Sequence, residues 1–103
     1  MGRVIGLRLL IACVTSVSVA QAHAEKADAG RARELVNAGE IQSLDSLRAQ
    51  HGNRLQGRLL STELEHQHKQ WVYELKILGD DGVVREISLN AKNGEWLNEE
   101  IEP

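Results

Sequence analysis

Hydrophobic positions first recur at a helical spacing, and this pattern predicts a helix ahead of Gly39. Ala32, Leu35 and Val36 fall on one side of the segment, with charged residues on the other. Asp28 precedes the run as a candidate N-cap, and Gly39 is placed to end the helix.

A second, shorter helix is predicted between Ser43 and Gly52. Leu44 and Leu47 point one way, and Ser43 is a candidate cap. Asp45 falls in the first turn, where a negative charge favours the helix dipole.

From Leu55 onward the pattern alternates between apolar and polar residues, which indicates β-strands with one solvated face. Leu60, Thr62 and Leu64 are expected to face inward in the first strand. The second strand has the clearest alternation, and its inward positions are Trp71, Tyr73, Leu75 and Ile77. A third strand places Ile87 and Leu89 inward.

Three polar segments separate these strands and predict the turns. The first is the segment 65–70, and the second is the segment 79–82, which ends in Gly82. Asn93-Gly94 is the strongest two-residue hairpin signal in the chain, and it returns Trp96 to the sheet.

The fold class that follows is α+β, with two short N-terminal helices packed on a three- to four-stranded antiparallel β-meander. The expected core consists of Leu35, Val36, Leu44, Leu47, Leu64, Trp71, Tyr73, Leu75, Ile77, Ile87 and Leu89.

Residues 1–24 have the layout of a cleaved signal peptide, which predicts export to the periplasm or secretion. Arg3 and Arg8 precede a mostly apolar run over residues 9–19, and small residues follow it. Cleavage before His23 and cleavage before Glu25 both fit. The run is too short for a transmembrane anchor, which needs about 20 apolar residues. A lipidated Cys13 is disfavoured because the apolar run continues past it.

Composition and charge argue against disulfides, multi-cysteine metal sites and nucleic-acid binding. The chain has 103 residues, a formal net charge of -3 and one cysteine, so neither an intrachain disulfide framework nor a multi-cysteine metal site is expected. Loss of Arg3 and Arg8 with the signal peptide makes the mature chain more acidic. An acidic chain argues against nucleic acid as a partner.

Several motifs resemble the PepSY domain, which is known from propeptides of secreted metallopeptidases and from small exported bacterial proteins. The resemblance covers residues 31–98 and leaves 25–30 as a flexible lead-in and 99–103 as an acidic tail. Asn90 stands where the family often has Asp. The matching motifs are Arg33–Ile41 with Ser43-Leu44-Asp45, Val72-Tyr73-Glu74-Leu75, Asp81-Gly82, Arg85-Glu86, Leu89-Asn90-Ala91 and Asn93-Gly94-Glu95.

The resemblance implies an exported binding or regulatory module that contacts a protease or a membrane sensor, with inhibition as the expected effect. It implies no catalytic residues and no cofactor. The residues agree, since the chain contains no Gly-x-Ser-x-Gly, His-Glu-x-x-His or phosphate-loop pattern. An enzyme is therefore not expected, and the oligomeric state is left open.

The alternative function is sensing of a small ligand or metal through the His66 and His68 turn. Both side chains share one face if the segment is a strand, and Glu65 or His51 is a candidate third ligand. A solvated polar turn explains the same residues.

Trp96 has two interpretations. It either holds the small sheet together or anchors a partner, as tryptophan often does at binding hot spots. Glu63 and Glu65, two apart on one strand face, are explained by a solvated face and also describe a carboxylate pair.

Overall fold

The computed structural model describes residues 25–103, so the predicted signal peptide at 1–24 and Cys13 lie outside the described residues. Over 25–103 the chain forms two α-helices and a five-stranded antiparallel sheet, which confirms the α+β class. In chain order the elements are β1 (Glu25–Ala27), α1 (Ala29–Asn37), α2 (Leu44–His51), a 3₁₀-helix η1 (Gly52–Leu55), β2 (Arg58–Gln67), β3 (Gln70–Leu78), β4 (Val84–Asn90) and β5 (Trp96–Ile101).

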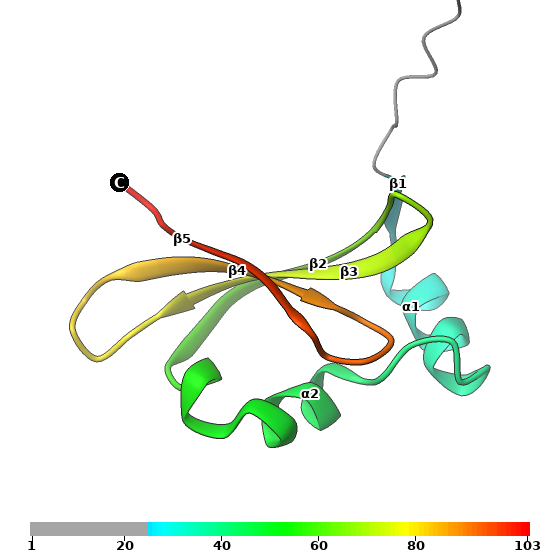
Figure 1. Ribbon diagram of the computed structural model, residues 1–103, viewed down its shortest axis with the longest axis horizontal. Coiled ribbons are helices and arrows are strands. Elements are labelled where there is room, and N and C mark those ends of the chain that lie inside the picture. The colour runs from blue at the N-terminus through cyan, green and yellow to red at the C-terminus, as the bar shows by residue number, and fades with distance from the viewer. Residues whose placement is uncertain (1–24) are drawn as a thin grey trace, which may run out of the picture.

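The strands lie in the sheet in the same order as in the chain, and each pairs antiparallel with its neighbours. Both helices and η1 lie together on one side of this sheet (Figure 1). The other side is left without a covering helix in the part of the chain that the structure describes.

Capping residues fix the ends of the two helices. The Asp28 carboxylate accepts a hydrogen bond from the backbone N–H of Arg31 at 2.8 Å, and the Ser43 hydroxyl accepts one from Ser46 at 3.1 Å. Gly39 ends α1 in the left-handed region with φ of 74°. The N–H of the next residue then reaches back over the last turn to the carbonyl of Leu35 at 3.0 Å.

The strand count and the two ends of the domain differ from the prediction. Glu25–Ala27 is the edge strand β1, paired with Leu64–His66, and α1 begins at Ala29, so 25–30 is not a flexible lead-in. A three-residue strand is too short to show an alternation. At the other end β5 runs to Ile101, so residues 99–101 belong to the sheet, because ladder hydrogen bonds do not require apolar side chains.

The tightest hairpin is not at the expected place. His68 and Lys69 form a two-residue turn between β2 and β3, with φ of 47° and 66°. Asn93 and Gly94 do lie in a turn, but the loop spans five residues, 91–95, and the N–H of Asn90 donates to the Glu95 carbonyl at 2.8 Å. The Asn90 side chain favours this longer loop because its Oδ1 accepts backbone N–H bonds within it.

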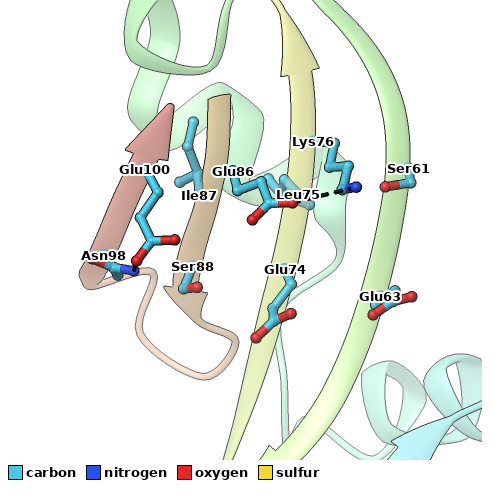
Figure 2. Close-up of a pocket in the computed structure, with 10 residues that line it drawn as sticks. All are labelled: Ser61, Glu63, Glu74, Leu75, Lys76, Glu86, Ile87, Ser88, Asn98 and Glu100. Atoms are coloured by element: carbon cyan, nitrogen blue, oxygen red, sulfur yellow. Dashed lines mark hydrogen bonds and ion pairs between the residues drawn. The ribbon is translucent and has the colours of Figure 1, made fainter. Parts of the chain in front are cut away.

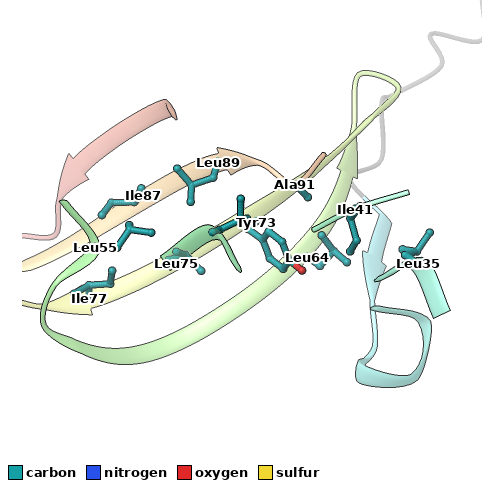
Figure 3. Packing of buried hydrophobic residues seen from close by; sticks show 11 residues of the cluster. Leu35, Ile41, Leu55, Leu64, Tyr73, Leu75, Ile77, Ile87, Leu89 and Ala91 are labelled. Carbon is teal, nitrogen blue, oxygen red and sulfur yellow. The ribbon is translucent and has the colours of Figure 1, made fainter. Parts of the chain in front are cut away.

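The core lies between the helices and the sheet (Figure 3). Of the expected core, Val36, Leu44 and Trp71 are half-buried against the cluster, and the remaining positions are buried. Three residues of the buried cluster were not predicted, namely Ile41, Leu55 and Ala91, and Val72 is buried outside the cluster although it was expected on the solvated face. The buried cluster contains Leu35, Ile41, Leu47, Leu55, Leu64, Tyr73, Leu75, Ile77, Ile87, Leu89 and Ala91.

Leu60 does not face the core, contrary to the prediction. The register of β2 against β3 shifts between Leu59 and Ser61, so Leu59 lies opposite Ile77 and packs on the core. Leu60 becomes the extra residue of a β-bulge and is 47% exposed. Thr62 is likewise exposed, although it lies opposite Leu75.

Candidate functional site

The face of the sheet that points away from the helices is the main candidate site, and we call it the open face. Because Tyr73, Leu75 and Ile77 point toward the helices, the alternation turns Glu74 and Lys76 to the opposite side. A hollow of about 530 Å³ lies along this face. Figure 2 shows its lining residues, which are Ser61, Glu63, Glu74, Leu75, Lys76, Glu86, Ile87, Ser88, Asn98 and Glu100.

The strand register arranges the polar side chains of the open face in rows across the sheet. One row runs Ser61, Lys76, Glu86, Glu100 from β2 to β5. The next row runs Glu63, Glu74, Ser88, Asn98. Each row contains two glutamates directly opposite each other on neighbouring strands, an arrangement that costs stability.

Lys76 is the central cation of the open face. Its ammonium lies 3.3 Å from the Glu86 carboxylate and 3.4 Å from that of Glu102. The hydrogen bonds that Lys76 donates to Glu86, and then to Glu102, raise the pKa of Lys76 above its ordinary value. These ion pairs connect β3 to β4 and to the residue that follows β5.

A second, tighter group of carboxylates lies where β1 meets the sheet. Ligand oxygens of Glu63, Glu65 and Glu74 all lie within 4.8 Å of one another. The Gln67 amide donates to Glu65 at 2.7 Å and to Glu74 at 3.1 Å, while Lys26 lies 3.3 Å from Glu63. Glu65 is only 7% exposed, because it faces Val72 on one side and β1 on the other.

Carboxylate oxygens of this kind are the ligands that Ca²⁺ and Mg²⁺ prefer. Among residues 25–103, one group of three or more ligand-type side chains lies close enough together to hold an ion, and it consists of Glu63, Glu65 and Glu74. The group contains no histidine. The open face as a whole carries six carboxylates against Lys26, Arg58 and Lys76, so it is acidic. The carboxylates are those of Glu63, Glu65, Glu74, Glu86, Glu100 and Glu102.

The two histidines proposed as metal ligands are not brought together on one strand face. β2 ends at Gln67, so His68 lies exposed in the turn. His66 packs its ring against Trp71, with the centroids 4.8 Å apart, on the side of the sheet opposite Glu65. His51, the other candidate ligand, instead hydrogen-bonds the Gly94 carbonyl at 2.6 Å.

A second hollow of about 560 Å³ lies on the helix side, where α1 ends near the β2–β3 turn. His66 and Trp71 form one wall, and Lys69 and Lys92 oppose Glu40 at its rim. This hollow therefore has the opposite balance of charge from the open face.

Trp96 is half-buried and held on both sides from within the molecule. The His51 ring meets it edge-on at 5.3 Å between centroids, and the Arg54 guanidinium lies 3.9 Å from its ring centre. Its role as a partner anchor stays a prediction, since these contacts also explain the residue structurally.

The sequence indicated Glu63 and Glu65 as a pair but did not connect them with Glu74. The outward position of Glu74 was visible in the alternation of 71–77, but the residue opposite it depends on the register of β2 against β3. The two-residue turn at His68 and Lys69 sets that register, and the polar segment 65–70 did not indicate which two residues would form the turn.

No family model matches the chain, and neither the curated proteins nor the solved structures contain a match. The resemblance to the PepSY domain therefore stays an expectation. Within residues 25–103 none of the helices combines the length and hydrophobicity needed to cross a membrane.

Proposed function

We propose that this chain is an exported, non-catalytic binding module of the PepSY type that regulates a protease or a membrane sensor. It docks through the open face onto a basic surface of its partner. Inhibition is the effect we expect, by obstruction of the surface to which the domain binds.

The observation that carries the proposal is the charge of the uncovered sheet face. A sheet normally buries one face and solvates the other with mixed polar residues. Here the solvated face gathers glutamates into cross-strand pairs, including Glu63 with Glu74 and Glu86 with Glu100. Like charges placed opposite each other lower stability, and a basic partner relieves that cost on binding.

The chemistry of the face also favours binding over catalysis. The serines that line the hollow, Ser61 and Ser88, lie in rows with Lys76 and Glu74 rather than beside a histidine. A nucleophile needs a base within hydrogen-bond reach, and the hydrogen bonds of the described residues include none between a serine and a histidine.

Cross-linking of the mature chain to its native envelope, followed by mass spectrometry, tests the proposal. The bait is compared with a double variant, Glu63→Lys with Glu74→Lys, and with a control of equal charge, Glu34→Lys with Glu40→Lys. The control residues are exposed, Glu34 on α1 and Glu40 in the segment that follows it. A protease or sensor that is captured by the native chain and the control, and lost with the open-face variant, is expected. Capture unaffected by the open-face variant contradicts the proposal.

A further inference from the structure

Two pairs of opposed glutamates lie near the two edges of the sheet, and in each pair a lysine contacts one member. At the β2 edge Glu63 lies opposite Glu74, and the added strand β1 places the Lys26 ammonium 3.3 Å from Glu63. The short strand β1 thus places a cation beside one member of this pair.

At the β5 edge Glu100 lies opposite Glu86, and no strand of the described chain follows β5 in the sheet. Lys76 bonds Glu86 and Glu102, and among residues 25–103 Glu100 forms no ion pair. Its one side-chain hydrogen bond comes from the Asn98 amide at 3.4 Å. Among the described residues Glu100 is therefore the member of this pair without a cation beside it, and no strand beyond β5 supplies one.

The backbone of β5 is also available for pairing. The N–H of Glu102 donates to the Val84 carbonyl at 2.9 Å. Because every second residue of an antiparallel strand bonds the same neighbour, the backbone N–H and C=O of Glu100 also point toward β4. Glu99 and Ile101 then present their N–H and C=O groups to the free edge. Ile101 is 65% exposed and adds an apolar side chain beside these groups.

We propose that the β5 edge accepts an extended segment of the partner protein as a sixth strand. The segment places a Lys or Arg directly opposite Glu100 and an apolar residue beside Ile101. This inference rests on the proposed function and specifies how the partner binds. A second copy of the chain fits less well, because it would bring another Glu99 and Glu100 against the first pair.

A synthetic peptide with alternating lysine and valine, capped at both ends, is the probe. Binding is expected to slow hydrogen exchange of the Glu99 and Ile101 amides and to weaken with added salt. Glu100→Lys replaces an attraction by a repulsion, which corresponds to an affinity loss of about two- to thirtyfold. The control Glu95→Lys makes the same charge change at an exposed loop position and is expected to bind as the native chain does.

Backbone pairing is tested separately with Ile101→Pro, which removes an outward N–H without changing the charge. Proline is tolerated at such edge positions, so the fold is expected to persist. Ile101→Pro abolishes peptide binding in this scheme, whereas Ile101→Ala keeps the N–H and retains most of it. Equal binding by Ile101→Pro and Ile101→Ala overturns the inference, as does a peptide that leaves the β5 amides unprotected.

The captured partner separates failure of this inference from failure of the proposed function. A partner that is lost with Glu63→Lys and Glu74→Lys but retained by Ile101→Pro supports the binding module and overturns the sixth strand. Dimers that disappear with Ile101→Pro in sedimentation show that a second copy occupies the edge, which also overturns it. Loss of the partner with Ile101→Pro and Glu100→Lys, but not with Glu95→Lys, supports the inference.

Discussion

Glu63 and Glu74 lie directly opposite each other on β2 and β3, so two carboxylates face one another across neighbouring strands. The Gln67 amide hydrogen-bonds Glu74, and the Lys26 ammonium pairs with Glu63. These neighbours offset the repulsion only in part, because Glu65 adds a third carboxylate within 4.8 Å. The open face therefore keeps three carboxylates close together beside one lysine.

Glu74→Gln is expected to stabilise the protein, because it removes a like-charge repulsion and keeps an oxygen that can accept from Gln67. The free energy of unfolding should rise by about 0.5 kcal/mol at low salt, within the usual range for cross-strand pairs. Urea unfolding at low and high salt measures the change, which should shrink as salt screens the charges.

Glu95→Gln is the matched control, since Glu95 is exposed in the β4–β5 loop and has no carboxylate opposite it in the ladder. Its unfolding free energy should stay within the error of the native value. A lower unfolding free energy for Glu74→Gln would show that this carboxylate stabilises the fold, contrary to the prediction.

Asp81 and Arg85 form an ion pair at the Gly79–Val83 turn, and it gives stability a defined dependence on pH. The Arg85 side chain, and then the Val83 N–H, lower the pKa of Asp81 below its ordinary value of 3.8. A lowered carboxyl pKa contributes stability that is present above the ordinary value and lost as pH falls through the folded value.

Asp81→Asn keeps the oxygen that accepts from Val83 and removes the charge that pairs with Arg85. The melting temperature of the variant should lie below that of the native protein near neutral pH, and the two should converge as pH falls below the ordinary pKa of 3.8. Asp80→Asn, at an exposed position in the same turn, is the control. A gap between Asp81→Asn and the native chain that persists at acid pH would assign the effect to geometry rather than charge.

The sequence predicted those parts of the fold that depend on side chains close together in the chain. The caps Asp28 and Ser43, the terminating glycine of α1 and the inward face of β3 were readable because each depends on a few adjacent residues. β1 and the extension of β5 to Ile101 depend instead on backbone pairing with a distant strand. For the same reason the sequence predicted only the Glu63 and Glu65 pair of the candidate site. Glu63 and Glu74 become neighbours through the strand register alone.

Two glycines at positive φ separate backbone strain from steric contact. A Cβ at Gly57 would lie 2.5 Å from the Leu78 carbonyl oxygen, with φ of 129°, whereas one at Gly82, with φ of 78°, would meet nothing within 4 Å. Gly82→Ala should therefore cost about 1 kcal/mol. Gly57→Ala should cost about 3 kcal/mol because the contact adds to the strain. Urea unfolding of both variants checks the order, and equal losses would contradict the contact at Leu78.

Trp96 lies between the His51 ring and the Arg54 guanidinium, so its contribution to the fold can be measured apart from partner binding. Arg54→Met keeps much of the packing and removes the cation over the ring, which should lower the free energy of unfolding by about 0.5–1 kcal/mol. Trp96→Ala should cost about 3 kcal/mol, the usual loss for a large aromatic packed on a core. Urea unfolding followed by circular dichroism measures both.

Arg33→Met is the control for Arg54→Met, because Arg33 is exposed on α1. It should leave both the unfolding free energy and the Trp fluorescence unchanged, whereas Arg54→Met should shift the Trp96 emission. If Arg54→Met is as stable as the native chain and its emission is unchanged, the indole is not held by Arg54. Trp96 would then keep only the His51 contact of these two, which would favour its role as a partner anchor over its structural role.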